Sequence, residues 1–457
     1  MTTRSSSPAA RDGKPIKQVH LAAHVPGVNN TTVWSDPTSG SQLDFASFVH
    51  LARTAERGKF DFFFLAEGLR LREHRGQIFD LDVVGRPDSM TVLAALASMT
   101  DRVGLAATVN TTFNEPYALA RQFATLDHLS GGRAAWNAVT SPDSFTGENF
   151  RRGGFLDREL RYDRAEEFML TARELWDSWD AGAVLSDQAG GAFLRDGAVH
   201  PFEHRTEGFS IAGKFNVPRS PQVYPVQIQA GDSDGGRELA AKLADVIFSR
   251  HSGYSDGRAF YSDVKRRLAA HGRTHEDLKI IPATTAVVGD TEQDAEEKAA
   301  HIRLQQVSPQ GAIAFLEQVW GMDLSAYDPD GPLPDVDPDV SGEGITRGRV
   351  RHEKDSLAVA AKWRAMAEEK NLSIRQLIIE VTTRSSFVGT AAQIAGRIDR
   401  YVQEDAADGY ILVPHLTPHG LDEFVDRVVP ELQDRGVFRT EYAGTTLRDH
   451  LGLAVPA

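Results

Sequence analysis

Short apolar runs alternate along the chain with longer segments in which apolar residues recur at helical spacing. Eight runs have the composition of buried strands: 18–25, 60–66, 103–109, 134–139, 226–230, 245–249, 280–288 and 410–414. Eight helical segments are interleaved with them: 44–57, 88–99, 116–129, 161–180, 236–243, 256–271, 291–306 and 422–434. This alternation predicts an α/β fold, a TIM-type (β/α)8 barrel built around a parallel sheet.

Helix boundaries are marked by residues with known capping roles. Asp88 and Thr291 precede helical segments and can accept hydrogen bonds from unpaired amides, and Pro116 suits a first helical turn. Glycines at 131–132 and at 436 end helices where a positive φ is needed.

The alternation is interrupted twice, at about 181–225 and at about 307–405, and we interpret both segments as insertions. Residues 202–218 in the first resemble a hairpin. In the second, residues 326–344 are too rich in Pro, Gly and Asp for a helix or a central strand. The segment 307–350 is therefore a candidate lid, and residues 373–382 and 390–404 are predicted helices.

The N-terminal residues 1–17 are polar and small, which predicts a disordered lead-in before a single domain over 18–457. The lead-in lacks the apolar core of a signal peptide, and no run reaches the roughly 18 apolar residues that span a bilayer. We therefore expect no membrane association.

The charge balance argues against nucleic acid as a partner. There are 50 Lys and Arg against 64 Asp and Glu, a net charge of −14, with no long basic run. The chain has no cysteine, which excludes disulfides, thiolate metal sites and a cysteine nucleophile and is consistent with a cytoplasmic location.

Polar residues gather where the predicted strands end. In a parallel barrel the chemistry lies at these carboxyl ends, which read LAEGL (65–69), ATVNTT (107–112), WNAVTS (136–141) and QAGDSDGGRE (229–238). Thr108 and Asn137 interrupt apolar neighbours, although either could simply satisfy an internal hydrogen bond. Glu67 follows a very apolar strand, where a carboxylate needs a partner.

The 229–238 stretch is a candidate phosphate site. A Gly-rich turn that opens a helix presents backbone N–H groups to an anion, and Ser233 adds a hydroxyl. A plain Gly-rich βα turn is the alternative. Arg158, Arg161 and Tyr162, at the start of the fourth barrel helix, could hold the same phosphate, although Arg161 could instead pair with nearby acids.

His20 and His24 have a four-residue spacing but lie on a predicted strand, and no other metal-ligand motif accompanies them. No metal site is predicted. His24, at the strand end, is a candidate for substrate contact or proton transfer. Because no nucleophile elbow, Ser-His-Asp order or isolated carboxylate pair stands out, the chemistry is expected to come from a cofactor.

Longer motifs resemble one family. These are GKFDFFFLAEGL, EPYALARQFATLDHLSGGRAAWNAVTS, ENF followed by RYDRAEEF, SPQVYPVQIQAGDSDGGRE, MDLSAYDPDGPLP and FVDRVVPELQDRGVFRTEYAGTTLRDHLGL. Between about Val19 and Leu453 the chain resembles the luciferase-like flavin monooxygenases of the nitrilotriacetate and dibenzothiophene-sulfone monooxygenase branch.

The resemblance implies the oxygenase component of a two-component system. Such a barrel receives FMN as FMNH2 from a separate NAD(P)H:FMN reductase, forms a flavin C4a-(hydro)peroxide with O2, and inserts one oxygen atom into a small organic substrate. The substrate class includes xenobiotics containing sulfur, nitrogen or halogen. Transferred by position, Glu67, Thr108 and Asn137 face the flavin ring and ribityl chain, and Tyr162 and Ser233 hold the phosphate. Relatives also form homodimers or homotetramers, and apolar C-terminal positions such as Leu451, Leu453 and Val455 belong either to such an interface or to the barrel packing.

Three departures from the family pattern concern the site. Glu67 replaces a usual Asp, and Arg158 replaces a frequent His while adding a charge suited to phosphate. The segment VNNTTVWSD replaces a His-containing segment ending in AWR, so the substrate contacts of that His do not transfer. An F420-dependent oxidoreductase of the same superfamily, a non-catalytic flavin-binding barrel and a flavin-free barrel hydrolase remain as alternatives.

Overall fold

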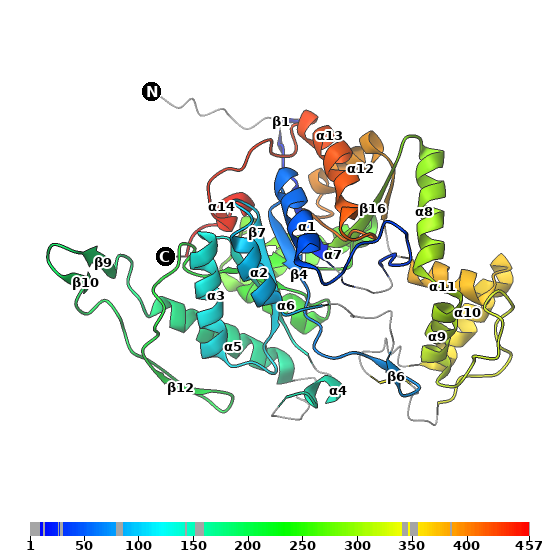
Figure 1. The fold of residues 1–457 in the computed structure, drawn as a ribbon, viewed down its shortest axis with the longest axis horizontal. Coiled ribbons are helices and arrows are strands. Elements are labelled where there is room, and N and C mark those ends of the chain that lie inside the picture. Colours follow the sequence, from blue (N-terminus) through cyan, green and yellow to red (C-terminus); the bar gives the residue numbers. More distant parts are fainter. Residues whose placement is uncertain are drawn as a thin grey trace.

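The computed structural model describes residues 10–11, 14–25, 27, 31–78, 86–141, 144–150, 160–340, 346–347, 355–383 and 386–456. A central parallel sheet is enclosed by helices (Figure 1). Within these residues, no helix is both long and apolar enough to cross a lipid bilayer.

The central strands correspond to the eight predicted runs. Neighbouring strands pair in parallel, in the order β15-β14-β13-β8-β7-β4-β3-β19-β16. Their bounds are β3 (His20–Val25), β4 (Phe62–Leu65), β7 (Gly104–Asn110), β8 (Ala134–Val139), β13 (Val226–Gln229), β14 (Val246–Ile247), β15 (Lys279–Ile280), β16 (Ala283–Gly289) and β19 (Gly409–Leu412).

One extended segment, 279–289, closes this sheet into a barrel. Its first half bonds to β14, with Ile281 N donating to Ile247 O at 3.0 Å. Its second half bonds to β19, with Ile411 N donating to the Pro282 carbonyl at 2.9 Å. The apolar run 280–288 predicted a single strand, whereas the structure has β15 and β16, because Pro282 lacks the N–H that would continue the ladder. The predicted TIM-type (β/α)8 barrel is confirmed.

Helices cover the outside of the barrel, and all eight predicted helical segments are present. They are α1 (Phe45–Arg57), α2 (Ser89–Ala97), α3 (Pro116–Ser130), α5 (Leu160–Asp177), α6 (Asp234–Leu243), α7 (Tyr254–Leu268), α8 (Glu292–Gln306) and, for the last, a π-helical turn (Phe424–Val428) followed by α13 (Val429–Asp434). The predicted caps form: the Asp88 carboxylate accepts from Thr91 N at 2.7 Å, and Gly131 and Gly436 have φ of 66° and 70°.

The segment 181–225 forms two hairpins on the opposite side of the barrel from α9, α10 and α11 (Figure 1). β11 (Phe202–Arg205) pairs with β12 (Ser210–Gly213), which confirms the predicted hairpin. The hairpin of β9 (Val184–Asp187) and β10 (Ala192–Leu194) was not predicted, because its strands are largely exposed and lack an apolar alternation.

The segment 307–405 contains more regular structure than its sequence indicated. Helices α9 (Pro309–Trp320), α10 (Ser356–Lys370) and α11 (Ile374–Thr382) share an apolar cluster that includes the fully buried Trp320. β18 (Ser386–Thr390) then pairs with β16 beyond the barrel, and α12 (Ala391–Gln403) leads to β19. Residues 326–340 contain neither helix nor strand, as predicted, and 341–344 lie outside the described residues.

Short elements lie at the edges of the barrel. β5 (Glu73–His74), β6 (Gln77–Ile78) and β17 (Thr346–Arg347) form a small sheet, α4 (Ser144–Gly147) follows β8, and α14 (Leu447–Leu451) ends the fold. Within the predicted lead-in, β1 (Ala10–Arg11) pairs with β2 (Lys14–Pro15).

Alternate residues of each strand face the barrel interior or the surrounding helices. Phe62, Phe64, Ala106, Ala135 and Ile228 share the interior cluster with Leu447, Leu451 and Leu453. Leu451 and Leu453 were predicted to lie either at a subunit interface or in the barrel packing, and in the structure they pack in the barrel. Val455 is 52% exposed. By the same alternation, Thr108 and Asn137 point inward, two residues beyond Ala106 and Ala135.

Candidate active site

Thr108 and Asn137 are direct neighbours across the ladder between β7 and β8. The Asn137 amide Nδ2 donates to the Thr108 hydroxyl at 3.0 Å, and both side chains are buried. The Asn137 carbonyl oxygen Oδ1 is also buried, yet it accepts no hydrogen bond from any described residue. A buried, unpaired oxygen costs about 1–3 kcal/mol, so this atom is a candidate acceptor for a ligand N–H or O–H.

Glu67 lies just beyond β4 and is paired with a residue that sequence analysis did not single out. The fully buried Asn110, at the end of β7, donates through Nδ2 to both Glu67 carboxylate oxygens, at 3.0 and 3.2 Å. Burial raises the pKa of Glu67 to about 7, against the opposing effect of the Asn110 hydrogen bonds. Glu67 can therefore exchange a proton near neutral pH. The sequence could have indicated Asn110, because it lies two residues after Thr108 on the same strand, so its side chain also faces the barrel interior.

The turn between β13 and α6 is built from closely packed glycines. A Cβ on Gly236 would lie 2.7 Å from the Gly231 Cα and 3.0 Å from the Tyr162 hydroxyl, and one on Gly235 would lie 3.1 Å from the Tyr162 ring. No side chain larger than hydrogen fits at Gly236 without movement. The Ser233 hydroxyl caps α6 by accepting from Gly236 N at 3.3 Å.

Tyr162, on the first turn of α5, reaches this same turn. Its hydroxyl lies 2.8 Å from the Ser233 hydroxyl, so the two groups predicted to bind one phosphate are side by side. Arg161 adds positive charge, because its Nη2 donates to the Tyr162 hydroxyl at 3.2 Å and its guanidinium lies 4.6 Å from the ring centre. Arg158 lies outside the described residues, so its predicted contact stays a prediction.

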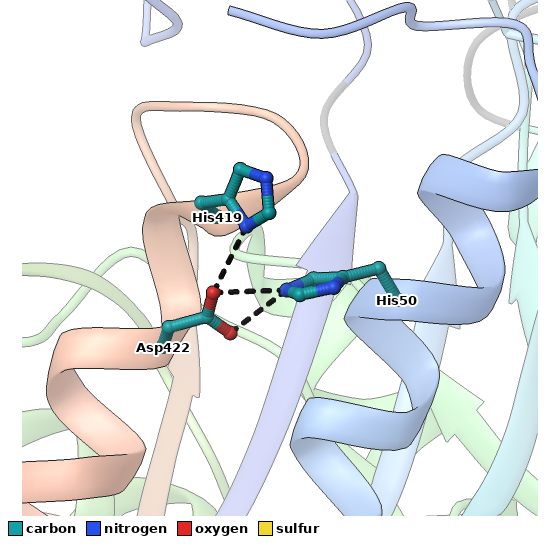
Figure 2. Close-up of side chains that lie close together, drawn as sticks. All are labelled: His50, His419 and Asp422. Carbon is teal, nitrogen blue, oxygen red and sulfur yellow. Dashed lines mark hydrogen bonds and ion pairs between the residues drawn. The ribbon is translucent and has the colours of Figure 1, made fainter. Parts of the chain in front are cut away.

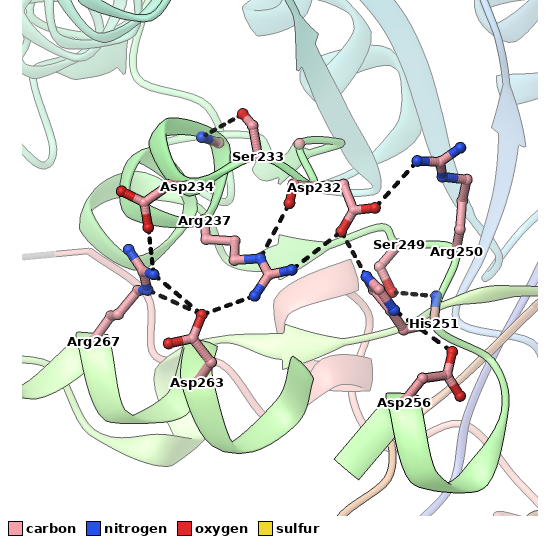
Figure 3. A network of polar contacts seen from close by, with 12 residues as sticks. Asp232, Ser233, Asp234, Arg237, Ser249, Arg250, His251, Asp256, Asp263 and Arg267 are labelled. Carbon is pink, nitrogen blue, oxygen red and sulfur yellow. Dashed lines mark hydrogen bonds and ion pairs between the residues drawn. The ribbon is translucent and has the colours of Figure 1, made fainter. Parts of the chain in front are cut away.

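A charged network surrounds the residue preceding Ser233 (Figure 3). The Asp232 carboxylate contacts His251 Nε2 at 2.7 Å and Arg250 Nη2 at 3.2 Å, and Arg237 Nε donates to the Asp232 carbonyl at 3.2 Å. Burial alone would raise the pKa of Asp232, but His251 and Arg250 lower it below its usual range. The network offsets the negative charge of Asp232 beside the candidate anion site. It joins the turn after β13 to the loop after β14, a contact that the spacing of these residues in the sequence does not predict.

His24 lies at the end of β3, next to β4. It is buried, its Nδ1 lies 3.4 Å from the Phe64 carbonyl, and its ring lies 5.0 Å from the Phe64 ring, which stacks on Phe248. His20, at the start of the same strand, instead contacts the buried Asp61 at 3.2 Å. The two histidines therefore have separate surroundings, with only His24 at the carboxyl end.

Comparison with known proteins places this arrangement in one family. Residues 28–409 match the family model described as luciferase-like monooxygenase. The chain belongs to the luciferase-like monooxygenase family. It is accordingly a flavin-dependent monooxygenase, and the family resemblance noted from its motifs is confirmed.

Two relatives within the family match nearly the whole chain. Nitrilotriacetate monooxygenase component A of Aminobacter aminovorans is 42% identical over 90% of this chain and 91% of its own length. Dibenzothiophene-sulfone monooxygenase of Rhodococcus erythropolis (strain XP) is 38% identical over 96% of this chain and 98% of its own.

Two solved structures that are similar to this chain confirm the fold. DmoA from Hyphomicrobium sulfonivorans superposes with a TM-score of 0.80 at 30% identity, covering 95% of this chain and 92% of its own. Riboflavin lyase, solved with a modified FMN and riboflavin, superposes with a TM-score of 0.77 at 27% identity, over 96% of this chain and 97% of its own length.

Proposed function

We propose that this family member is the oxygenase component of a two-component, FMNH2-dependent monooxygenase that inserts one atom of O2 into a small organic substrate. The observation that carries the proposal is the meeting of Tyr162 and Ser233 at the N-terminus of α6, beside closely packed glycines. A helix N-terminus with two hydroxyls and nearby guanidinium charge suits a phosphate.

The phosphate end of FMN fits the donors present. Tyr162 and Ser233 supply hydroxyls, Gly235 and Gly236 leave room for close approach to backbone amides, and Arg161 supplies charge. Arg158, which lies outside the described residues, is assigned to the same phosphate as a second guanidinium. Asp232 is kept from repelling the phosphate because His251 and Arg250 bind its carboxylate.

Polar side chains at the ends of β4, β7 and β8 support binding of the flavin ring and ribityl chain. Asn137 Oδ1 is a buried acceptor without a partner among the described residues, and we assign it to a flavin N–H or a ribityl hydroxyl. Thr108 orients that amide from the neighbouring strand. Glu67, held by Asn110, can accept or donate a proton at its carboxyl group near neutral pH.

Reduced FMN, when bound, supplies the electrons with which one oxygen atom enters the substrate and the other becomes water. The task of the chain is to position the substrate and to exclude bulk water, because water promotes unproductive loss of hydrogen peroxide. His24 contributes a ring nitrogen for substrate contact or proton transfer. We assign the role of the lid to the segment 307–350, whose described residues include α9 and the irregular stretch 326–340.

FMN is favoured over F420 because the family members with substantial identity are named monooxygenases, and because riboflavin lyase was solved with a modified FMN. A separate NAD(P)H:FMN reductase supplies FMNH2. The substrate is a small organic compound that contains sulfur, nitrogen or halogen; relatives named for nitrilotriacetate, dibenzothiophene sulfone and dimethyl sulfide support the first two, although another relative is named for a long-chain alkane. The active form is a homodimer or homotetramer located in the cytoplasm.

The test is a reconstituted reaction. The purified chain is titrated with FMNH2 under anaerobic conditions and then mixed with a generic NADH:FMN reductase, O2 and a panel of small sulfur, nitrogen and halogen compounds. Oxygenated product that depends on both proteins supports the proposal.

The alternatives predict different results. Reduction of F420 by an alcohol, with no need for O2, would identify the F420-dependent oxidoreductase. Tight flavin binding with hydrogen peroxide as the sole product across the panel would favour a non-catalytic flavin-binding barrel. Absence of flavin binding would contradict the proposal outright.

A further inference from the structure

Two histidines and an aspartate converge on the outside of the barrel, away from the residues of the candidate active site. His50 lies on α1, while His419 and Asp422 lie in the connection that follows β19 (Figure 2). His50 Nε2 lies 2.9 Å from both Asp422 carboxylate oxygens, and His419 Nδ1 lies 3.1 Å from Oδ2. The ligand-type atoms of all three side chains lie within 4.8 Å of one another.

We propose that His50, His419 and Asp422 form a binding site for a divalent transition metal of the Zn²⁺ class. Bonds of about 2.0–2.1 Å to tetrahedral Zn²⁺ place ligand atoms roughly 3.3 Å apart. Both separations between a histidine nitrogen and the carboxylate are already near this value. His419 is 56% exposed at its side chain, so it has room to adjust its distance from His50.

The chemistry of the donors selects the metal. Two imidazole nitrogens and one carboxylate suit Zn²⁺, Co²⁺, Ni²⁺ or Cu²⁺, whereas Mg²⁺ and Ca²⁺ prefer sets made only of oxygen. Three protein ligands leave a fourth position for water, and the partial exposure of His50 and Asp422 (36% and 28% at their side chains) gives an entry path.

Contacts behind the three ligands hold them in place. Thr54, one turn after His50 on α1, donates its hydroxyl to Asp422 Oδ1 at 2.8 Å and so orients the carboxylate. The Arg57 guanidinium lies 4.0 Å from Asp422, but it also pairs with Asp426, which offsets its charge.

A bound metal would link the first helix of the barrel to the connection that follows its last strand. α1 follows the first barrel strand, and the connection after β19 follows the last. The same connection bonds to residues after β3, through Val33 N to the His415 carbonyl at 2.7 Å, and Leu416 and Gly420 line a cavity of about 200 Å³. The site would therefore act as a structural clamp on that connection.

The experiment uses the untagged full chain after removal of metals with a chelator. Titration with Co²⁺ is followed by visible absorption, and titration with Zn²⁺ by calorimetry. We expect one equivalent to bind, with a dissociation constant in the micromolar range or lower, to raise the melting temperature and to resist competition by millimolar Mg²⁺.

Variants decide whether these residues are the ligands. His50→Gln, His419→Asn and Asp422→Asn should each weaken binding by at least about tenfold, and Thr54→Val by about tenfold. The matched control is His271→Asn, which removes a surface histidine paired with the single carboxylate of Glu238 at 2.7 Å and should leave binding unchanged. Circular dichroism verifies that each variant folds.

The proposal is overturned if the chain binds no stoichiometric Co²⁺ or Zn²⁺. It is also overturned if the His50→Gln, His419→Asn double variant, folded as the parent is, binds the metal as tightly as the parent does. In that case the three side chains form only a hydrogen-bonded cluster.

Discussion

The hydroxyl groups of Tyr162 and Ser233 lie 2.8 Å apart, although 71 residues separate them in the sequence. Tyr162 comes from the first turn of α5 and Ser233 from the turn that opens α6, so the contact joins two successive βα units at the carboxyl ends of their strands.

Tyr162→Phe removes one hydroxyl from the proposed phosphate site without removing the ring that packs against Gly235. We expect FMNH2 affinity to fall by about 1 kcal/mol, or roughly fivefold, because one hydrogen bond is lost, and by more if that bond is to a charged phosphate. Ser233→Ala should have a similar effect on affinity, and it should also lower stability by about 1 kcal/mol because it removes the cap of α6. Anaerobic flavin titration and chemical denaturation measure the two effects, and unchanged affinity in both variants would refute the site assignment.

Gly236→Ala should prevent the turn from closing, since the added Cβ would lie 2.7 Å from the Gly231 Cα and 3.0 Å from the Tyr162 hydroxyl. We expect a loss of flavin affinity larger than that of Tyr162→Phe. Gly396→Ala, on α12, is the control, because its nearest atoms lie 3.5 Å away, in ordinary contact. Equal flavin affinities for the two alanine variants would argue against a tight glycine turn at the site.

Glu67→Gln tests the raised pKa of this carboxyl group. In the folded chain burial raises the pKa of Glu67 from 4.5 to about 7, so the folded state keeps a proton that the unfolded state releases. Stability is therefore full below pH 4.5 and falls as the pH rises towards and through 7, by on the order of 3 kcal/mol. Glu67→Gln stays neutral, and its advantage in unfolding free energy should grow between pH 5 and pH 8. A difference that is the same at both values of pH would contradict the assignment.

The double variant Asn137→Leu, Thr108→Val distinguishes an effect on flavin affinity from an effect on the stability of the fold. Replacing both partners of a buried hydrogen bond with apolar groups of similar shape is nearly neutral for stability, and it also removes Asn137 Oδ1, which has no partner among the described residues. We expect the flavin-free double variant to unfold within about 1 kcal/mol of the parent, while flavin affinity falls by about tenfold or more. If flavin affinity persists, the buried oxygen serves another purpose.

His24→Ala should lower the fraction of consumed O2 that appears in product while leaving flavin affinity intact. The imidazole lies at the end of β3 beside Phe64 and is assigned to substrate contact or proton transfer rather than to the flavin. The readout is hydrogen peroxide relative to oxygenated product in the reconstituted reaction. Weaker flavin binding, with normal coupling, would place His24 against the cofactor instead.

Much of the barrel could be predicted from local sequence patterns. The interleaved strands and helices, the Asp88 cap and the positive φ of Gly131 and Gly436 depend on neighbours in the chain, and all were confirmed. The hairpin β9–β10, the strand β18 and the break at Pro282 were not predicted, because exposed strands carry little apolar pattern and because pairing partners lie far away in sequence.

Strand and helix periodicity is a local property, so the order of residues along the chain was enough to identify those that stand at the carboxyl ends of the strands. It thereby named Glu67, Thr108, Asn137 and Ser233 near strand ends, and Tyr162 at the start of the following helix, as candidates. Which of these residues meet depends on how the strands pair. Register places Asn137 beside Thr108, the pairing of β8 with β13 brings the following Tyr162 and Ser233 together, and the pairing of β4 with β7 brings Asn110 to Glu67, whose pKa burial then raises. Distances, desolvation and unpaired atoms arise from contacts between distant segments, and a linear pattern does not contain them.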